Sequence, residues 1–274
     1  MYKLAVFDLD GTLLDRHHEI SNDNKTALRR LSDSGCHIVI ATGRPDMLVK
    51  EYLYQLNLDT PVISCNGAMI RQPISGQIFY QQVLPKKKAL EVLSLCKDNN
   101  HIYMAYTSDA IVTTDNYRTK YFQERNKKLD ESCRTRFIIE HDVKKISENF
   151  DIYKILIIER DEKKYNLMKD RLEDLTGVTK VSSAKGFYDI MPLNTSKKNA
   201  IDQLIDHFNI KISEVVAFGD NYNDVEMLKH VGTAITTSNG VSDVKEISDF
   251  ISIDHNDSGI AHAINSYIFK DSEA

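Results

Sequence analysis

Short apolar runs alternate with helix-like patterns over the first part of the chain. Each run ends in a polar, glycine-containing turn, which is typical of a buried strand. Between the runs, apolar residues recur at the spacing of one helix face, and Ser21 stands at an N-cap position before the first helix. Strands that alternate with helices indicate a parallel sheet with right-handed crossovers. The expected strands cover residues 3–7, 37–41 and 61–65, and the expected helices cover 22–31 and 45–56.

The pattern changes after residue 82 and returns only near residue 189. The middle stretch predicts helices at 85–97 and 162–175, hairpins at 102–114 and 179–191, a strand at 151–158, and a polar segment at 118–136 that begins as a helix. The later stretch predicts helices at 196–208, 224–229 and 259–269 and strands at 215–218, 233–236 and 250–253. We therefore expect an α/β core made of residues 1–83 and 189–274, with an α+β unit inserted at 84–188.

Composition sets limits on the class of protein. A length of 274 residues and a hydrophobic fraction of 42% allow two domains with real cores. The net charge of −5 argues against a general nucleic-acid binder. We expect no membrane span, since no apolar stretch approaches the roughly 20 residues that one needs, and no signal peptide. The four cysteines lack C-x-x-C spacing. Cys36 and Cys65 lie in or beside apolar runs, so we interpret these two as buried thiols rather than metal ligands, and we expect a reducing cytoplasm.

Asp8 and Asp10 follow the first apolar run, at the end of a strand where α/β sheets bind ligands. Carboxylates spaced i, i+2 share a face of an extended chain, unless the chain unwinds at Gly11. Two like charges held that close need a cation or a shared proton. A metal site, or a nucleophile with its acid/base, explains them better than a solvated turn. An ordinary Asp-Gly turn is the alternative at this point.

A second cluster of polar residues follows the apolar run at 215–218. Asp220 and Asp224, with two asparagines, stand within six residues just before an expected helix. An N-cap near the positive end of the helix dipole would explain Asp224 alone. It explains less well why so many oxygen ligands gather at one strand end. Hard oxygen ligands of this kind suit Mg²⁺.

Weaker signals lie at two other strand ends and at one helix start. Thr42, Gly43 and Arg44 offer a hydroxyl and free backbone N–H groups to an anion, although a simple turn has the same pattern. Asn66 follows the third expected strand. Lys197 begins a helix, where the dipole disfavours a cation. A functional charge would account for that position, and an exposed, solvated lysine is the alternative.

Taken in order, these motifs resemble those of a known superfamily. The four motifs of the haloacid dehalogenase superfamily are matched by Asp8-x-Asp10-Gly11-Thr12, Thr42, Lys197 and Gly219-Asp220-x-x-Asn223-Asp224. More closely, the chain is similar to Cof-type sugar phosphatases, which imply a Rossmann-like parallel-sheet core with an inserted α+β cap. Two departures adjoin the expected site: Lys198 replaces the usual glycine, and Thr-Ser-Asn-Gly at 237–240 replaces Met-Gly-Asn-Ala. We expect both to alter substrate fit more than chemistry.

The resemblance implies a covalent mechanism. Asp8 would be the nucleophile that forms an aspartyl-phosphate, and Asp10 the general acid/base. Mg²⁺ would be held by Asp8, the backbone carbonyl of Asp10, Asp220 and Asp224. Lys197 would neutralise both the phosphate and the nucleophile. As an acid, Asp10 needs a raised pKa, and we expect the neighbouring carboxylate to raise it.

The expected function is Mg²⁺-dependent hydrolysis of small phosphorylated metabolites such as sugar phosphates. The expected substrate-binding residues are Thr42, Gly43, Arg44, Asn66 and Asn223. Tyr117, Tyr121 and Lys185 are candidate cap contacts, with a solvated helix face as the alternative. Two rival functions remain. One is a phosphotransferase or mutase with the same intermediate, and the other is a non-catalytic metabolite-binding protein. We expect a monomer or weak homodimer that binds neither nucleic acid nor membranes.

Overall fold

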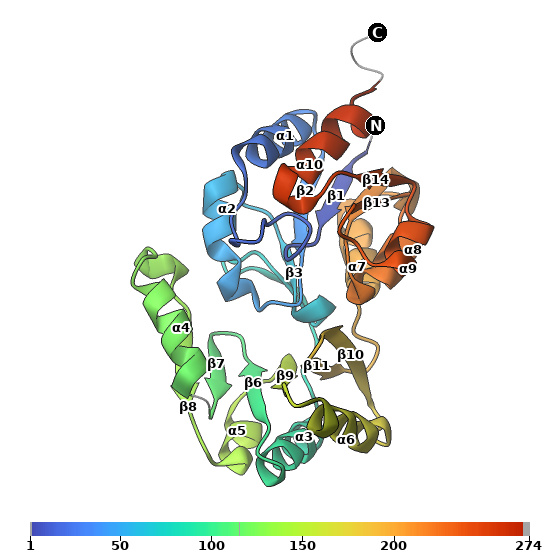
Figure 1. The fold of residues 1–274 in the computed structure, drawn as a ribbon. Helices are drawn as coiled ribbons and strands as arrows, with labels where there is room; N and C mark the ends of the chain where they lie inside the picture. Colours follow the sequence, from blue (N-terminus) through green and yellow to red (C-terminus); the bar gives the residue numbers. More distant parts are fainter. Residues whose placement is uncertain (1, 115, 271–274) are drawn as a thin grey trace.

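The computed structural model describes residues 2–114 and 116–270, which form two sheets with their own helices (Figure 1). The larger sheet has eight strands in the order β14-β13-β12-β1-β2-β3-β4-β5. The six strands from β14 to β3 run parallel, and β4 and β5 extend the edge in antiparallel fashion. These strands are β1 (Leu4–Phe7), β2 (His37–Ala41), β3 (Val62–Ser64), β4 (Met69–Arg71), β5 (Ile78–Gln81), β12 (Val215–Phe218), β13 (Thr233–Thr237) and β14 (Phe250–Ser252).

Helices cover both faces of this core sheet because its central strands are apolar on both sides. Ala5 and Phe7 of β1 pack toward one layer of helices, while Leu4 and Val6 pack toward the other. The first layer holds α1 (Asn22–Asp33), α2 (Lys50–Leu56) and α10 (Gly259–Ala263), which continues as a π-helical segment at Ile264–Ile268. The second layer holds α7 (Lys197–Phe208), α8 (Val225–His230) and α9 (Ser242–Ile247).

The smaller sheet forms the cap. Its six strands lie in the order β10-β11-β9-β6-β7-β8, and all pairs are antiparallel except β7 with β8. They are β6 (Ile102–Tyr106), β7 (Ala110–Thr113), β8 (Arg136–Ile139), β9 (Lys154–Ile158), β10 (Val178–Ala184) and β11 (Phe187–Pro192). Three helices, α3 (Lys86–Asp98), α5 (Val143–Asn149) and α6 (Glu162–Glu173), cover the face away from the core (Figure 1). The helix α4 (Asn116–Asn126) lies at the side of the cap.

The expected fold class, an α/β core with an inserted α+β cap, is confirmed. The apolar pattern missed β4, β5 and β8, which are short or half-exposed, and the short helix α5. The predicted boundary at residue 188 falls inside β11, which pairs with β10 as far as Pro192. We propose that the inserted unit extends to Pro192.

Two further observations concern composition. All four cysteines are buried free thiols. Among the described helices, none combines the length and the apolar character that a bilayer crossing requires.

Candidate active site

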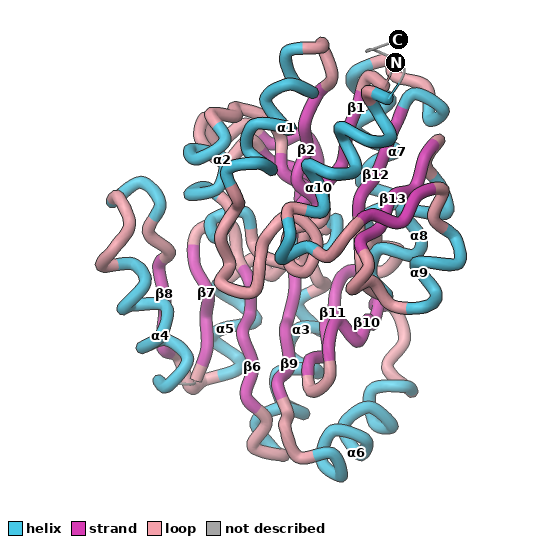
Figure 2. The backbone as a smooth tube through the Cα atoms, turned by 45° about the horizontal axis from the view of Figure 1, so that its top comes forward, coloured by secondary structure: helices cyan, strands magenta, loops and turns pink. Residues whose placement is uncertain are grey.

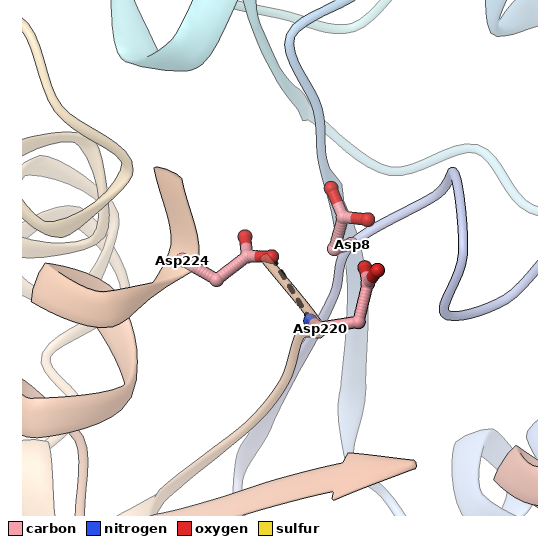
Figure 3. Close-up of side chains that lie close together, drawn as sticks. All are labelled: Asp8, Asp220 and Asp224. Carbon is pink, nitrogen blue, oxygen red and sulfur yellow. Dashed lines mark hydrogen bonds between the residues drawn. The ribbon is translucent and has the colours of Figure 1, made fainter. Parts of the chain in front are cut away.

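Three carboxylates meet where the central strands of the core sheet end. Asp8 follows β1 and Asp220 follows β12, and these strands are paired in register at Phe7 and Phe218. Asp224 ends a short 3-10 turn before α8. Oxygen atoms from Asp8, Asp220 and Asp224 lie within 4.8 Å of one another, and the three side chains point toward a common point (Figure 3). Asp224 is fully buried, and the other two are nearly so.

The loops that carry these carboxylates are shaped by local hydrogen bonds and by two glycines. Oδ2 of Asp224 accepts the backbone N–H of Asp220 at 3.1 Å (Figure 3). It also accepts the backbone N–H of Asn221 at 3.1 Å. A Cβ atom on Gly219 would lie 2.6 Å from that of Asp224, so only glycine fits there. Gly11 has φ +84°, and its Cβ would lie 2.4 Å from Asp220. Because glycine has no Cβ atom, the loops at Gly11 and Gly219 can lie this close to the carboxylates of Asp220 and Asp224.

Lys197, the first residue of α7, contacts two of these carboxylates. It is buried, and its Nζ lies 2.5 Å from Oδ1 of Asp8 and 2.7 Å from Oδ1 of Asp224. Burial alone would lower its pKa, but Asp224 and Asp8 more than compensate and raise it above the usual value. The lysine is therefore held as a cation between two carboxylates, rather than in solvent.

One lysine does not balance the negative charge of the cluster. Burial raises the pKa of Asp8 well above its usual value, since Asp224 and Asp220 counter the effect of Lys197. Burial and the charge of Asp224 also raise the pKa of Asp220 to about 6, against a hydrogen bond from Thr12 at 2.9 Å. Raised pKa values of crowded carboxylates show that a further positive charge would stabilise their ionised form. The three carboxylates could therefore hold a metal ion.

Asp10 does not behave as expected. Its side chain is 44% exposed and pairs with Arg44, whose Nε lies 2.7 Å from Oδ2, and with His18. Although partial burial raises the pKa of Asp10, the hydrogen bond from His18 and the charge of Arg44 lower it well below its usual value. The expectation of a raised pKa in this state is thus wrong, because the nearest charges are cations rather than carboxylates.

The other expected substrate-binding residues lie at or beside one cavity. Thr42 follows β2, and its hydroxyl accepts the backbone N–H of Arg44 at 3.1 Å, which fixes a tight loop around Gly43. Asn66 adopts a left-handed conformation (φ 57°) and accepts a hydrogen bond from Asn223 at 3.2 Å. The cavity measures about 520 Å³ and lies between core and cap. Thr42, Gly43, Arg44 and Asn223 line it together with Asp8 and Asp10.

Several residues at this cavity were missed by the sequence interpretation. Lys154 begins β9 and pairs with Asp189 of β11 at 3.0 Å, with side chains only 4% and 0% exposed. Asp189 also accepts a hydrogen bond from Asn66 at 2.9 Å, which joins cap to core. Arg125 of α4 reaches the core and donates to Tyr52 at 2.9 Å. The sequence did contain a signal for Lys154 and Asp189, because each is a charged residue in an apolar strand and such a residue needs a partner when it is buried.

Of the three candidate cap contacts, only the side chain of Lys185 is described. Lys185 is exposed at the tip of the β10–β11 hairpin and is not among the residues that line the cavity. The side chains of Tyr117 and Tyr121 lie outside the part of the structure that can be described.

Comparison with known proteins places this geometry in a family. The family described as haloacid dehalogenase-like hydrolase matches residues 5–264. The chain belongs to this family. As a haloacid dehalogenase-like hydrolase, it is 31% identical to "Phosphatase YwpJ" of Bacillus subtilis, over 95% of this chain and 98% of that protein. It is 28% identical to the "5-amino-6-(5-phospho-D-ribitylamino)uracil phosphatase YwtE" of the same species, over 97% and 98% of the two chains.

The fold agrees with that assignment. A solved haloacid dehalogenase-like hydrolase from B. subtilis superimposes with a TM-score of 0.86 at 29% identity, covering 97% of this chain and 99% of that one. The family expected from the motifs is therefore confirmed, and so is a hydrolase of the type that carries an inserted cap.

Proposed function

We propose that this hydrolase is a Mg²⁺-dependent phosphatase of small phosphorylated metabolites, acting through an aspartyl-phosphate on Asp8. The observation that carries the proposal is the position of Asp8. It faces the cavity, contacts Lys197 at 2.5 Å, and belongs to a cluster of three carboxylates. The relatives named as phosphatases, which match over nearly their whole length, support the same reaction class.

Each core residue has a role that its position supports. An oxygen of Asp8 attacks the phosphorus atom as the bond to the leaving oxygen breaks, and Lys197 offsets the charge on both groups. The hydroxyl of Thr42 and the N–H of Gly43 bind phosphoryl oxygens, since both lie at the cavity beside Asp8. Asn223 donates a hydrogen bond to Asn66, and we assign this pair the role of orienting the site.

Asp10 handles the proton in both halves of the reaction. It protonates the leaving oxygen and then, as a carboxylate, accepts a proton from the water that hydrolyses the aspartyl-phosphate. The contacts with Arg44 and His18 favour the carboxylate, which is the form needed in the second half. For the first half, Arg44 must shift from Asp10 toward the substrate phosphate, so that Asp10 regains a more ordinary pKa.

The donor set suits Mg²⁺. Asp8, Asp220 and Asp224 offer hard carboxylate oxygens, and the backbone carbonyl of Asp10 would add another. When bound, the ion neutralises the phosphate and the carboxylates that would otherwise repel it. This requirement explains why one buried lysine stands among three carboxylates whose charges it cannot balance.

The covalent route is tested by Asp8→Asn. We expect this variant to release no phosphate from a panel of phosphorylated metabolites, while its melting temperature shows that it remains folded. Asp170→Asn, a matched change on the exposed side of α6, should keep full activity. EDTA should abolish turnover of the unmodified enzyme, and Mg²⁺ should restore it. Substantial turnover by Asp8→Asn would exclude the aspartyl-phosphate.

The rival functions differ in their products. A phosphotransferase or mutase would pass the phosphoryl group from Asp8 to another hydroxyl, so excess sugar acceptor would yield a new phosphate ester in place of inorganic phosphate. A non-catalytic homologue would bind metabolites without turnover. The complete set of Asp8, Asp10, Thr42, Lys197 and Asp220 at one site argues against the non-catalytic alternative.

A further inference from the structure

The cap sheet turns one of its faces toward the core site. The face is built by three neighbouring strands, β6, β9 and β11, which lie side by side in Figure 2. Successive side chains of a strand point to opposite faces, so residues two apart share one face. Three such pairs line the cavity: Met104 and Tyr106, Lys154 and Leu156, and Phe187 and Asp189. The opposite face packs against α3, α5 and α6.

This face has a charged part close to the phosphate loop. Lys154 and Asp189 form their buried ion pair there, and Tyr106 stands opposite Lys154 across the strand pair. A Cβ atom on Gly43 would lie 3.4 Å from Nζ of Lys154, so the ammonium directly adjoins the loop that would bind phosphate. Lys154 and Asp189 would therefore lie beside the phosphate group of a bound substrate.

Beyond the charged part the face is apolar. Leu156 stands one repeat along β9 from Lys154, about 7 Å further at the usual rise of a strand, and Met104 is paired with it. Phe187 and Phe122 add partly exposed rings at the cavity. The ring of Phe122 is held by stacking on Phe137, with centroids 5.3 Å apart and an angle of 22° between the ring planes.

We propose, on the basis of the proposed phosphatase function, that the preferred substrate is a phosphomonoester whose leaving group carries a planar ring. The ring would lie against Phe122, Phe187 and Leu156, while the phosphate occupies the Thr42–Gly43 loop. A cavity of about 520 Å³ has room for such a group beyond the phosphate. Aromatic side chains gain from stacked or edge contacts with a second ring. In the apolar part of the face, a polyhydroxylated sugar would instead place hydroxyls against side chains that cannot hydrogen-bond to them.

Flavin mononucleotide and ribitol 5-phosphate form a matched pair of probes, because both end in the same ribityl phosphate and only one carries a ring. We expect kcat/KM to be at least tenfold higher for flavin mononucleotide. Phe187→Ala and Phe122→Ala should each lower that preference about tenfold, mainly by lowering kcat/KM for flavin mononucleotide. Tyr165→Ala, which removes a partly buried ring on the far side of the cap, should keep the preference.

Riboflavin tests ring binding without any reaction. We expect it to bind the unmodified enzyme, read as quenching of its fluorescence, and to bind Phe187→Ala at least tenfold more weakly. If ribitol 5-phosphate or glucose 6-phosphate is hydrolysed as well as flavin mononucleotide and riboflavin does not bind, the ring inference is wrong although the phosphatase proposal stands. If riboflavin binds but no phosphomonoester is hydrolysed, the phosphatase proposal fails and the ring site stands.

Discussion

Asp220→Asn should stabilise the metal-free protein. The substitution removes one of three crowded carboxylates and keeps an oxygen that can accept the hydrogen bond from Thr12. Because Asp220 is 9% exposed and its pKa rises from 3.8 to about 6 on folding, ionising it in the folded state costs about 3 kcal/mol. A raised pKa of this kind gives stability that is complete below pH 4 and is lost as pH rises through 6. The asparagine variant avoids that loss.

The gain should therefore depend on pH. With EDTA present, we expect Asp220→Asn to exceed the unmodified protein by as much as about 3 kcal/mol at pH 8, and by about half as much at pH 5. For a chain of this size, the larger gain corresponds to a rise in melting temperature of roughly 6 to 12 °C. Differential scanning calorimetry at the two pH values measures both. Saturating Mg²⁺ should shrink the difference, since it stabilises the unmodified protein by binding only the folded state.

Asp224→Asn provides the contrasting control. Asp224 accepts hydrogen bonds from two backbone N–H groups and pairs with Lys197 at 2.7 Å, so these contacts stabilise its negative charge. Removing that charge leaves the buried lysine with fewer partners, and we expect a loss of stability at both pH values. If Asp220→Asn proves no more stable than the unmodified protein at pH 8 without metal, the argument from crowded carboxylates is wrong.

Three further outcomes follow from the contacts. Arg44→Ala should raise the pKa of Asp10 in the free enzyme toward its usual value. The limb of the kcat/KM–pH profile that reports deprotonation of Asp10 should then move to higher pH, and an unmoved limb would contradict the role given to Asp10. Lys154→Met leaves a buried carboxylate unpaired and should cost about 3–5 kcal/mol, and neutralising that carboxylate in a double variant should recover most of it in thermal denaturation. Gly67→Ala should cost at least about 2 kcal/mol in urea denaturation, because φ is +107° and the new Cβ would lie 2.3 Å from a backbone oxygen. Gly76→Ala, with φ +80° and open space around it, should cost less.

The core could be predicted from the sequence because its chemistry follows directly from strand ends. Apolar runs mark β1, β2 and β12, and parallel order brings the ends of these strands to one edge of the sheet. The positions of Asp8, Thr42 and Asp220 directly after those runs are therefore enough to predict that the three lie close together. Two observations predict that Lys197 joins this site: a lysine at the start of a helix is disfavoured by the helix dipole, and Lys197 matches one of the family motifs.

The contacts across the cavity could not be predicted from the sequence in the same way. Lys154 and Asp189 lie 35 positions apart, on strands whose neighbours are set by the cap's own topology. The orientation of Asp10 toward Arg44 depends on side-chain rotamers and on His18, which stands in a loop with φ 61°. Residue spacing carries no information on such choices, because long-range packing decides which of two charged neighbours a carboxylate meets.

The short connection between β11 and α7 has a mechanical consequence. Pro192 is the last residue of the cap sheet, and Lys197 is the first residue of α7, only five positions later. The intervening segment includes Asn194 in a left-handed conformation and ends at Ser196, whose hydroxyl caps the helix. Any hinge movement of the cap on this side must be absorbed by residues 193–195. Lys197, which contacts Asp8, therefore stands directly after the short link between cap and core. A movement of the cap would act on the position of Lys197 through this link, so we expect a longer link to uncouple the two.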